Sequence, residues 1–356
     1  MRTSLGKISA AILACLVAGA AVAAEPVTVN FAISHPAVGV GEEIYLYFVP
    51  KRLGFFAKEG LDVELKIAGN VILAAQGLAN GSFQFATTTA PIVLKIREGG
   101  GDPLAIDNLK TDPGQQVAVL ADAPIRRLQD LKGRTVGSLE WGSQGGLALM
   151  VSLEQIGIGP NDYKRVVTGA GPAAAAALRS HQVDALALWD AMYGAMENGG
   201  LVLRYIDMPA ARLLSGFALA VSERYAAAHQ KVVEGFCRAV NEGLFFSHEN
   251  PAAAVSILLD GAPSLVPAGK DRAAVVKDDV HIYERYLANT LRGVPEGGKT
   301  GAIPADVWQY VADYNRKAGR LEGTVPPEKG YTTRFFEACN AFDRAPVAAL
   351  ARTFGQ

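Results

Sequence analysis

Short runs of hydrophobic residues alternate with amphipathic segments from Val27 onward. The short runs are flanked by polar turns, as buried strands are, and the segments between them space apolar residues three or four apart, as helices do. This alternation predicts an α/β fold built on parallel sheets. The first series predicts strands at Val27–Ile33, Leu61–Ile67, Phe83–Thr87 and Leu104–Asn108, with helices at Glu43–Phe56, Ile72–Asn80 and Pro91–Glu98.

A turn-rich segment at Lys110–Gly114 interrupts the alternation, which then starts again. The second series predicts strands at Gln116–Leu120, Thr135–Leu139, Lys164–Thr168 and Ala185–Leu188, with helices at Gly146–Ile156, Pro172–His181 and Ala191–Asn198. A weak internal repeat links the series, because Leu78–Pro91 and Leu178–Ala191 both indicate a helix end, a polar turn, a buried strand and a new helix. The two halves are therefore expected to be built alike.

One more strand is expected at Gly216–Val221, and a strand cannot stand alone, so it is expected to return to the first sheet. Helices are expected after it at Ala226–Ser247, Ala252–Leu259, Asp271–Leu291 and Ala305–Lys317. Such a chain crosses twice between two lobes, which predicts a hinge and a cleft. The expected division is 1–24 as a signal peptide, 25–111 as the first lobe, 112–213 as the second lobe, and 214–356 as the return to the first lobe with C-terminal helices.

The N-terminal segment has the layout of a secretory signal peptide. Arg2 and Lys7 precede an apolar stretch at Ile8–Val22, and small residues precede Glu25. An uncleaved membrane anchor and a lipoprotein cysteine at Cys15 are the alternatives, but the apolar run is short for either one. We therefore expect export to the periplasm as a soluble protein.

The composition is that of a packed protein. Of the 356 residues, 50% are hydrophobic and 19% are charged, and the formal net charge of −1 argues against a nucleic-acid or anionic-membrane partner. Three cysteines are too few for a disulfide scaffold or a thiolate metal cluster. Cys237 and Cys339 lie on apolar helix faces, as small core residues do, while an oxidising compartment also permits a disulfide between them.

The candidate site consists of residues that follow the predicted strands, since ligands of open α/β sheets bind beyond the carboxyl ends of strands. In the loop Trp141–Gly146, glycines and free N–H groups at a helix start suit an anionic oxygen, although Ser143 also fits an ordinary helix cap. Trp141 and Trp189 either present flat surfaces to a ligand or pack inside. Lys110 is a counter-ion candidate, and Asp190 an acceptor for an amine or a helix cap. The candidate ligand-binding residues are Ser34, His35, Asn70, Thr87, Thr88, Thr89, Lys110, Trp141, Gly142, Ser143, Gln144, Trp189 and Asp190.

Familiar catalytic and metal-binding motifs do not occur in the sequence. It contains no G-x-S-x-G, H-E-x-x-H, P-loop or C-x-x-C motif, and its five histidines are scattered. His35 has no metal-ligand partner at helical or hairpin spacing. The sequence therefore predicts no catalytic residue, no metal and no cofactor.

Four segments in order resemble a known family. They are YLYFVPKRLGFFAKEGLDVEL (45–65), AAQGLANGSFQFATTTAP (74–91), APIRRLQDLKGRTVGS (123–138) and AAALRSHQVDALALWDA (175–191). The family comprises the substrate-binding proteins of ABC importers for sulfonates, taurine, nitrate, aromatic carboxylates and thiamine-precursor pyrimidines, and the resemblance runs from about Val27 to about Pro251. It implies a two-lobed periplasmic-binding-protein fold of type II that closes on a small solute and delivers it to a membrane permease with its ATPase. The family's site positions fall after the first strand, at Thr87–Thr89, at Trp141–Gln144 and near Trp189–Asp190.

Three departures from the family pattern bear on the ligand. The chain has Asp190-Ala191 where the family often has Glu-Pro, Gln84 where Asp is usual, and His181 where Gly is usual. These changes leave the fold plausible and weaken the transfer of any one ligand to this chain.

The main hypothesis is a monomeric binding protein for a small organic anion of the sulfonate or aromatic carboxylate type. The alternative solute is a thiamine-precursor pyrimidine, with Asp190 as the hydrogen-bonding acid and a tryptophan as the stacking surface. An enzyme on the same fold is disfavoured, because the resemblance places catalysis in relatives with a Cys-rich segment. A sensor subunit cannot be separated from an importer subunit by sequence.

Overall fold

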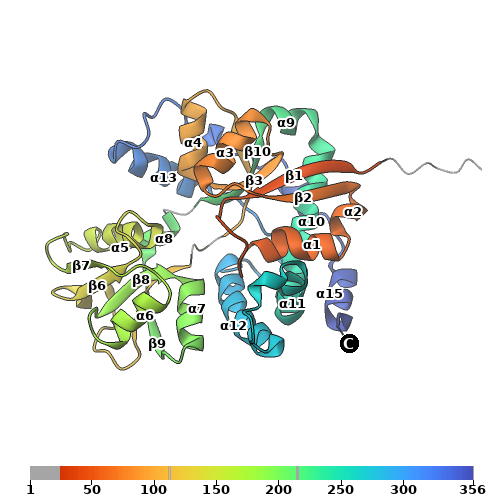
Figure 1. The fold of residues 1–356 in the computed structure, drawn as a ribbon. Coiled ribbons are helices and arrows are strands. Elements are labelled where there is room, and N and C mark those ends of the chain that lie inside the picture. Colours follow the sequence, from red (N-terminus) through yellow and green to blue (C-terminus); the bar gives the residue numbers. More distant parts are fainter. Residues whose placement is uncertain (1–24, 111, 113, 214–215, 356) are drawn as a thin grey trace, which may run out of the picture.

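The computed structural model describes residues 25–355 except 111, 113, 214 and 215, so the expected signal peptide lies outside the described residues. Two five-stranded sheets organise the chain into two lobes (Figure 1). Lobe 1 is built on the sheet β2-β1-β3-β10-β4, with β1 (Val27–Ile33), β2 (Leu61–Ile67), β3 (Phe85–Thr89), β4 (Pro103–Asn108) and β10 (Phe217–Ser222). Lobe 2 is built on the sheet β7-β6-β8-β5-β9, with β5 (Gln115–Leu120), β6 (Thr135–Ser138), β7 (Lys164–Val167), β8 (Ala185–Trp189) and β9 (Leu203–Asp207).

Both sheets are mixed, so the prediction of parallel sheets is wrong. β10 runs antiparallel to β3 and β4, and β5 runs antiparallel to β8 and β9. These are the strands next to the two crossings between lobes, where the chain enters a sheet from the other lobe rather than through a helix on its own face. The expected strand after residue 215 does return to the first sheet, where β10 lies between β3 and β4.

Lobe 1 carries most of the helices. Among the described residues they are η1 (Ile44–Phe48), α1 (Val49–Arg52), α2 (Phe55–Lys58), α3 (Val71–Asn80), α4 (Ala90–Glu98), α9 (Glu223–Ala228), α10 (Gln230–Glu249), α11 (Pro251–Gly261), η3 (Pro263–Leu265), α12 (Arg272–Thr290), α13 (Ala305–Lys317), η4 (Pro327–Lys329), α14 (Phe336–Cys339) and α15 (Arg344–Thr353). The single helix expected at Glu43–Phe56 is three short pieces, because the helix changes from π to α at Val49 and Gly54 adopts a left-handed φ of 76°. None of the described helices has the length and hydropathy needed to cross a bilayer.

Each sheet is covered on both faces by apolar packing. In lobe 1, α3 packs closely on the small residues Ala32, Ala86 and Ala220, while the opposite face packs on a larger core that includes η1 and α10. Lobe 2 has its own two cores, formed with η2 (Leu128–Leu131), α5 (Gln144–Glu154), α6 (Pro172–Arg179), α7 (Asp190–Asn198) and α8 (Pro209–Leu213). Each lobe therefore has apolar cores of its own.

The internal repeat is confirmed at the level of individual contacts. Gly81 and His181 occupy matching turns, and both have positive φ, 83° and 57°. Gln84 Oε1 accepts from the N–H of Asn30 at 2.9 Å, and Asp184 Oδ2 accepts from the N–H of Thr135 at 2.8 Å. The two departures from the family pattern, Gln84 and His181, thus preserve the local structure. The histidine adopts a left-handed conformation that glycine reaches with less strain.

The cysteines of α10 and α14 form a disulfide, Cys237–Cys339. Both residues are fully buried in the lobe 1 core, so the two expectations for them hold together. The bond joins α10 to a segment 102 residues later in the chain. It therefore fastens the C-terminal region to the body of lobe 1.

Replacing both cysteines with alanine is expected to lower the free energy of unfolding by about 2–5 kcal/mol, because the bond closes a long loop in the unfolded chain. Urea denaturation of the oxidised protein and the Cys237→Ala/Cys339→Ala variant measures the difference. Wild-type protein unfolded in reductant is the control and should match the variant. Equal midpoints for oxidised and reduced protein would contradict a bond between these residues.

Candidate functional site

A cavity of about 450 Å³ lies between the two lobes. Its walls come from the segments after β1, β3, β4 and β8, the start of α5, Phe217 at the start of β10, and Tyr286 of α12. This is the edge of the sheets where the sequence places the site, and the volume is in the range of ligand pockets. Both lobes contribute to it, so its shape depends on their relative position.

Eight of the thirteen candidate residues line this cavity. They are Ser34, His35, Thr89, Lys110, Ser143, Gln144, Trp189 and Asp190. The structure places the other five, Asn70, Thr87, Thr88, Trp141 and Gly142, outside the cavity lining. The positions of the strand ends therefore predict where the cavity lies, but they do not predict which side chains line it.

Three of these five support the local backbone. Asn70 caps α3 by accepting from two backbone N–H groups. Thr87 is buried and fixes Ser34, whose N–H donates to Thr87 Oγ1 at 2.9 Å. The Thr88 hydroxyl donates to the backbone carbonyl of Val71 at 3.0 Å. Of the three consecutive threonines, Thr89 is the one that lines the cavity.

Trp141 packs inside lobe 2 instead of facing the cavity. Its ring lies 6.0 Å from that of Tyr163, and the Arg165 guanidinium lies 5.6 Å from its centroid. Gly142 beside it is exposed. The sequence left both alternatives open for Trp141, and the structure shows it half-buried against the lobe 2 core and outside the cavity lining.

The glycine-rich loop is mainly a helix start. Ser143 caps α5, with its Oγ accepting from the N–H of Gly146 at 3.3 Å and donating to the carbonyl of Glu140 at 2.6 Å. A Cβ at Gly145 would lie 2.6 Å from the carbonyl oxygen of Ala187, so this glycine lets α5 pack closely on β8. Packing alone therefore accounts for much of the pattern that indicates an anion site.

Lys110 and Asp190 form a buried ion pair. The Lys110 Nζ lies 2.8 Å from Asp190 Oδ2, and the side chains are 9% and 1% exposed. The same oxygen accepts from Asn289 Nδ2 at 3.0 Å, and the ammonium lies 4.1 Å from the centre of the Tyr286 ring. Lys110, the candidate counter-ion, and Asp190, the candidate acid, therefore neutralise each other across the two lobes.

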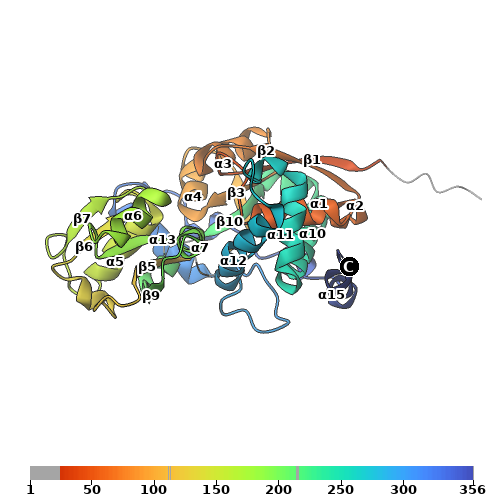
Figure 2. The same ribbon diagram turned by 60° about the horizontal axis from the view of Figure 1, so that its bottom comes forward.

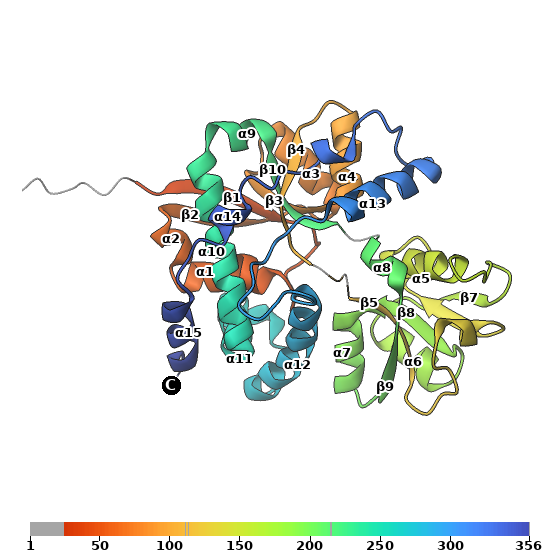
Figure 3. The ribbon, with the colours of Figure 1, turned by 180° about the vertical axis from the view of Figure 1, so that it is seen from behind.

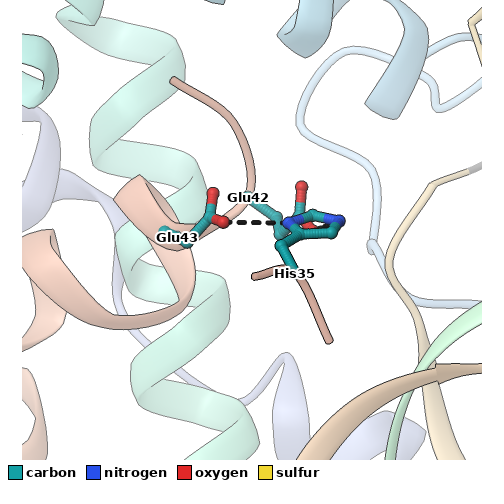
Figure 4. Close-up of side chains that lie close together, drawn as sticks. All are labelled: His35, Glu42 and Glu43. Carbon is teal, nitrogen blue, oxygen red and sulfur yellow. Dashed lines mark hydrogen bonds and ion pairs between the residues drawn. The ribbon is translucent and has the colours of Figure 1, made fainter. Parts of the chain in front are cut away.

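A second charged cluster joins His35 to two glutamates that the sequence reasoning missed. The His35 Nδ1 lies 3.0 Å from Glu43 Oε1, and its Nε2 lies 3.2 Å from Glu42 Oε1 (Figure 4). The hydrogen bond with Glu43 raises the pKa of His35 to about 9. Burial and the neighbouring Glu42 raise the pKa of Glu43 to about 7. Two adjacent acids directly before the apolar run of η1 are the sequence feature that could have indicated this cluster.

The cavity has no excess of positive charge. Among the described residues that line it, Glu42, Glu43 and Asp190 carry carboxyl groups, while Lys110 and His35 are the basic side chains. Gln115 adds a buried amide oxygen that accepts no hydrogen bond from the described residues. The cavity therefore offers acceptors for a solute that brings hydrogen-bond donors.

Aromatic rings stand on both sides of the cavity. Trp189 comes from lobe 2 and is half-buried, and Phe217 comes from lobe 1. The His35 ring is stacked with Phe217 at a centroid distance of 6.4 Å and an interplanar angle of 10°. A flat ligand between the lobes can contact aromatic surface on either side.

Two mixed sheets joined by two crossings, with a cavity between them at the strand ends, define a periplasmic solute-binding fold. The chain belongs to the NMT1/THI5-like family, whose model matches residues 42–254. This confirms the resemblance drawn from the sequence.

Individual relatives bind different solutes. The chain is 24% identical over 294 residues to the riboflavin-binding protein RibY of Chloroflexus aurantiacus, a match that covers 81% of each chain. Its fold is similar to the periplasmic aliphatic sulphonate binding protein SsuA of Escherichia coli, with a TM-score of 0.64, 16% identity, and coverage of 86% of this chain and 92% of that one. It is also similar to the periplasmic nitrate-binding protein NrtA of Synechocystis PCC 6803, with a TM-score of 0.56, 14% identity and 91% of both chains covered.

We expect the Lys110–Asp190 pair to be strongly coupled. Lys110→Met or Asp190→Asn alone should each lower the free energy of unfolding by about 3 kcal/mol, because each leaves a buried polar partner unpaired. The double variant should lose less than the sum of the two, as measured by a double-mutant cycle in urea. The exposed pair Lys51–Asp62, with N···O at 2.6 Å, is the matched control and should couple by less than about 1 kcal/mol. Equal coupling for the two pairs would contradict this account.

Proposed function

We propose that the chain is the extracytoplasmic solute-binding protein of an ABC importer and that its solute is a nitrogen-containing aromatic heterocycle, neutral or cationic, of the aminopyrimidine or flavin kind. The observation that carries the solute class is the charge balance of the cavity. Its one lysine is already paired with Asp190, and three carboxyl groups line the described part of the wall. A free anion would meet no unpaired lysine or arginine there, whereas ring N–H and amino groups would meet acceptors.

Hydrogen bonding favours a solute that donates. The amide oxygen of Gln115 is buried and accepts no hydrogen bond from the described residues. Leaving such an acceptor unpaired costs about 1–3 kcal/mol, so a solute that donates to it gains both affinity and selectivity. Amino-substituted heterocycles carry donors of this kind in the plane of the ring.

Stacking favours a flat solute. Trp189 and Phe217 belong to different lobes, so closure of the lobes would bring aromatic surface onto both faces of a ring. Affinity would then come from burial on closure, and selectivity from the few fixed acceptors. The riboflavin-binding relative is consistent with a ring of this type.

The remaining parts of the proposal follow from the importer class. Residues 25–111 with 214–356, and residues 112–213, would be the bodies that close on the solute. The closed form would be presented to a membrane permease and its ATPase on the periplasmic side, with the protein acting as a monomer. The proposal includes no catalytic step.

A small organic anion is the second candidate. Ser143, Gln144 and Gly145 line the cavity at the N-terminal end of α5, where backbone N–H groups favour negative charge. The sulphonate- and nitrate-binding proteins of similar fold are consistent with this solute class. This candidate relies on N–H groups rather than on a free cationic side chain.

A thermal-shift panel decides between the two classes. Aminopyrimidines, thiamine and riboflavin are expected to raise the melting temperature, since about 100-fold excess over Kd stabilises a binder by about 2.7 kcal/mol. Taurine, nitrate and aromatic carboxylates are expected to leave it unchanged. A response to the anions alone would overturn the proposed solute class. The protein is first unfolded and refolded, which removes solute carried over from expression. The screen is then run in EDTA.

Trp189 is expected to report the bound ring. The heterocycle found in the panel should quench tryptophan fluorescence, and Trp189→Phe should remove most of the quenching and weaken binding about tenfold, because one stacking surface is reduced. Trp141→Phe should behave as wild type, because Trp141 lies outside the cavity lining. Trp308→Phe is the control, since Trp308 is buried among α4, β4 and α13. Quenching that survives Trp189→Phe and disappears with Trp141→Phe would place the solute elsewhere.

A further inference from the structure

Three side chains with metal-ligand chemistry converge at one wall of the cavity. His35 lies in the segment after β1, and Glu42 and Glu43 directly precede η1. One nitrogen of the histidine and one oxygen of each glutamate lie within 4.8 Å of one another. Figure 4 shows the Glu43 carboxylate directed at the imidazole, with Glu42 beside the ring. The three residues thus lie within one nine-residue segment, and their spacing matches neither a helix nor a hairpin.

The two carboxylates of the cluster are buried, while the His35 side chain is 44% exposed. The side chains of Glu42 and Glu43 are 5% and 2% exposed, although both residues line the cavity. Glu42 Oε1 accepts no hydrogen bond within the part of the chain that the structure describes. His35 Nε2 lies 3.2 Å from this oxygen as an ion-pair partner, without hydrogen-bond geometry. A metal ion bound by both groups would satisfy the oxygen more fully than this contact does.

We propose that His35, Glu42 and Glu43 bind a divalent first-row transition metal ion of the zinc class. One imidazole nitrogen and two carboxylate oxygens form a mixed donor set that suits such ions better than calcium or magnesium, which prefer oxygen alone. Three protein ligands with the remaining position open are typical of sites where the ion also meets a small molecule. Here all three side chains belong to residues that line the solute cavity.

Charge supports the same assignment. Two buried carboxylates stand together with one imidazole, which compensates one negative charge at most when protonated, and Lys110 is itself paired with Asp190. A divalent cation would compensate both carboxylates at once. The site goes beyond the proposed solute function, and it departs from the sequence-based expectation of no metal.

The backbone around the cluster is suited to hold ligands in place. Glu43 is the residue before a π-helix, η1, whose residues Ile44, Tyr45, Leu46 and Phe48 are buried in the lobe 1 core. π-Helical turns are rare and occur often at functional sites. Donor atoms around one zinc ion lie about 3–4 Å apart for bonds of about 2.0–2.2 Å, so rotation of the side chains would complete the site.

The test is titration of tag-free protein that begins at Glu25, after EDTA treatment, with zinc chloride in a calorimeter. We expect one zinc ion per chain, with affinity reduced more than about 100-fold by His35→Ala and by Glu43→Gln, a larger loss than second-shell changes cause. His229→Ala is the matched control, because His229 is an exposed histidine that contacts Tyr225 away from the cavity. Calcium chloride should bind far more weakly than zinc.

Several results would overturn the proposal. They are no zinc binding by the wild-type protein, zinc binding that survives both variants, and calcium binding that exceeds zinc binding. Melting curves establish that each variant is folded, and Glu42→Gln replaces any variant that is not. Since the solute panel is run in EDTA, failure of the metal site leaves the solute result intact, and failure of the panel leaves the zinc titration intact.

Discussion

The buried ion pair between Lys110 and Asp190 is the contact on which the arrangement of the cleft depends. Lys110 follows β4, where the chain leaves lobe 1, and Asp190 begins α7 in lobe 2. Asn289 of α12 donates to the same carboxylate oxygen, so three separate segments meet at one charge. The pair joins the two lobes at the cavity, and it leaves Lys110 without a free charge for a ligand. A solute in the cavity therefore meets mainly hydrogen-bond acceptors and aromatic rings.

The same region carries a connection between lobes that strand order alone does not show. α12 packs beside α7, as Figures 2 and 3 show from different sides. Glu197 of α7 lies 2.9 Å from His281 and 3.3 Å from Arg285, both on α12. Packed interfaces tend to move as units while a few hinge residues absorb the change. The α7–α12 contact joins the two lobes beside the cavity, whose lining includes Asp190 of α7 and Tyr286 of α12.

The sequence predicts what depends on local pattern and misses what depends on contacts across the chain. β1 and β2 match their expected ranges, because each alternates or concentrates apolar residues over a full strand. β9 was not expected, since LRYID is largely half-buried and carries little apolar signal. In the site, Trp141 lies shortly after β6 and Trp189 ends β8, yet only Trp189 lines the cavity. Which face a side chain takes depends on packing that spacing does not record.

His35 shows how one residue can serve two roles at such a site. The face of its ring is parallel to Phe217, so it belongs to the aromatic surface of the cavity. Its two nitrogens lie at the edge of the ring and point to Glu42 and Glu43. Stacking uses the face and coordination uses the edge, so the two interactions do not compete for the same atoms. A metal ion held at that edge would also fix the orientation of the ring, and with it the surface that a flat solute meets.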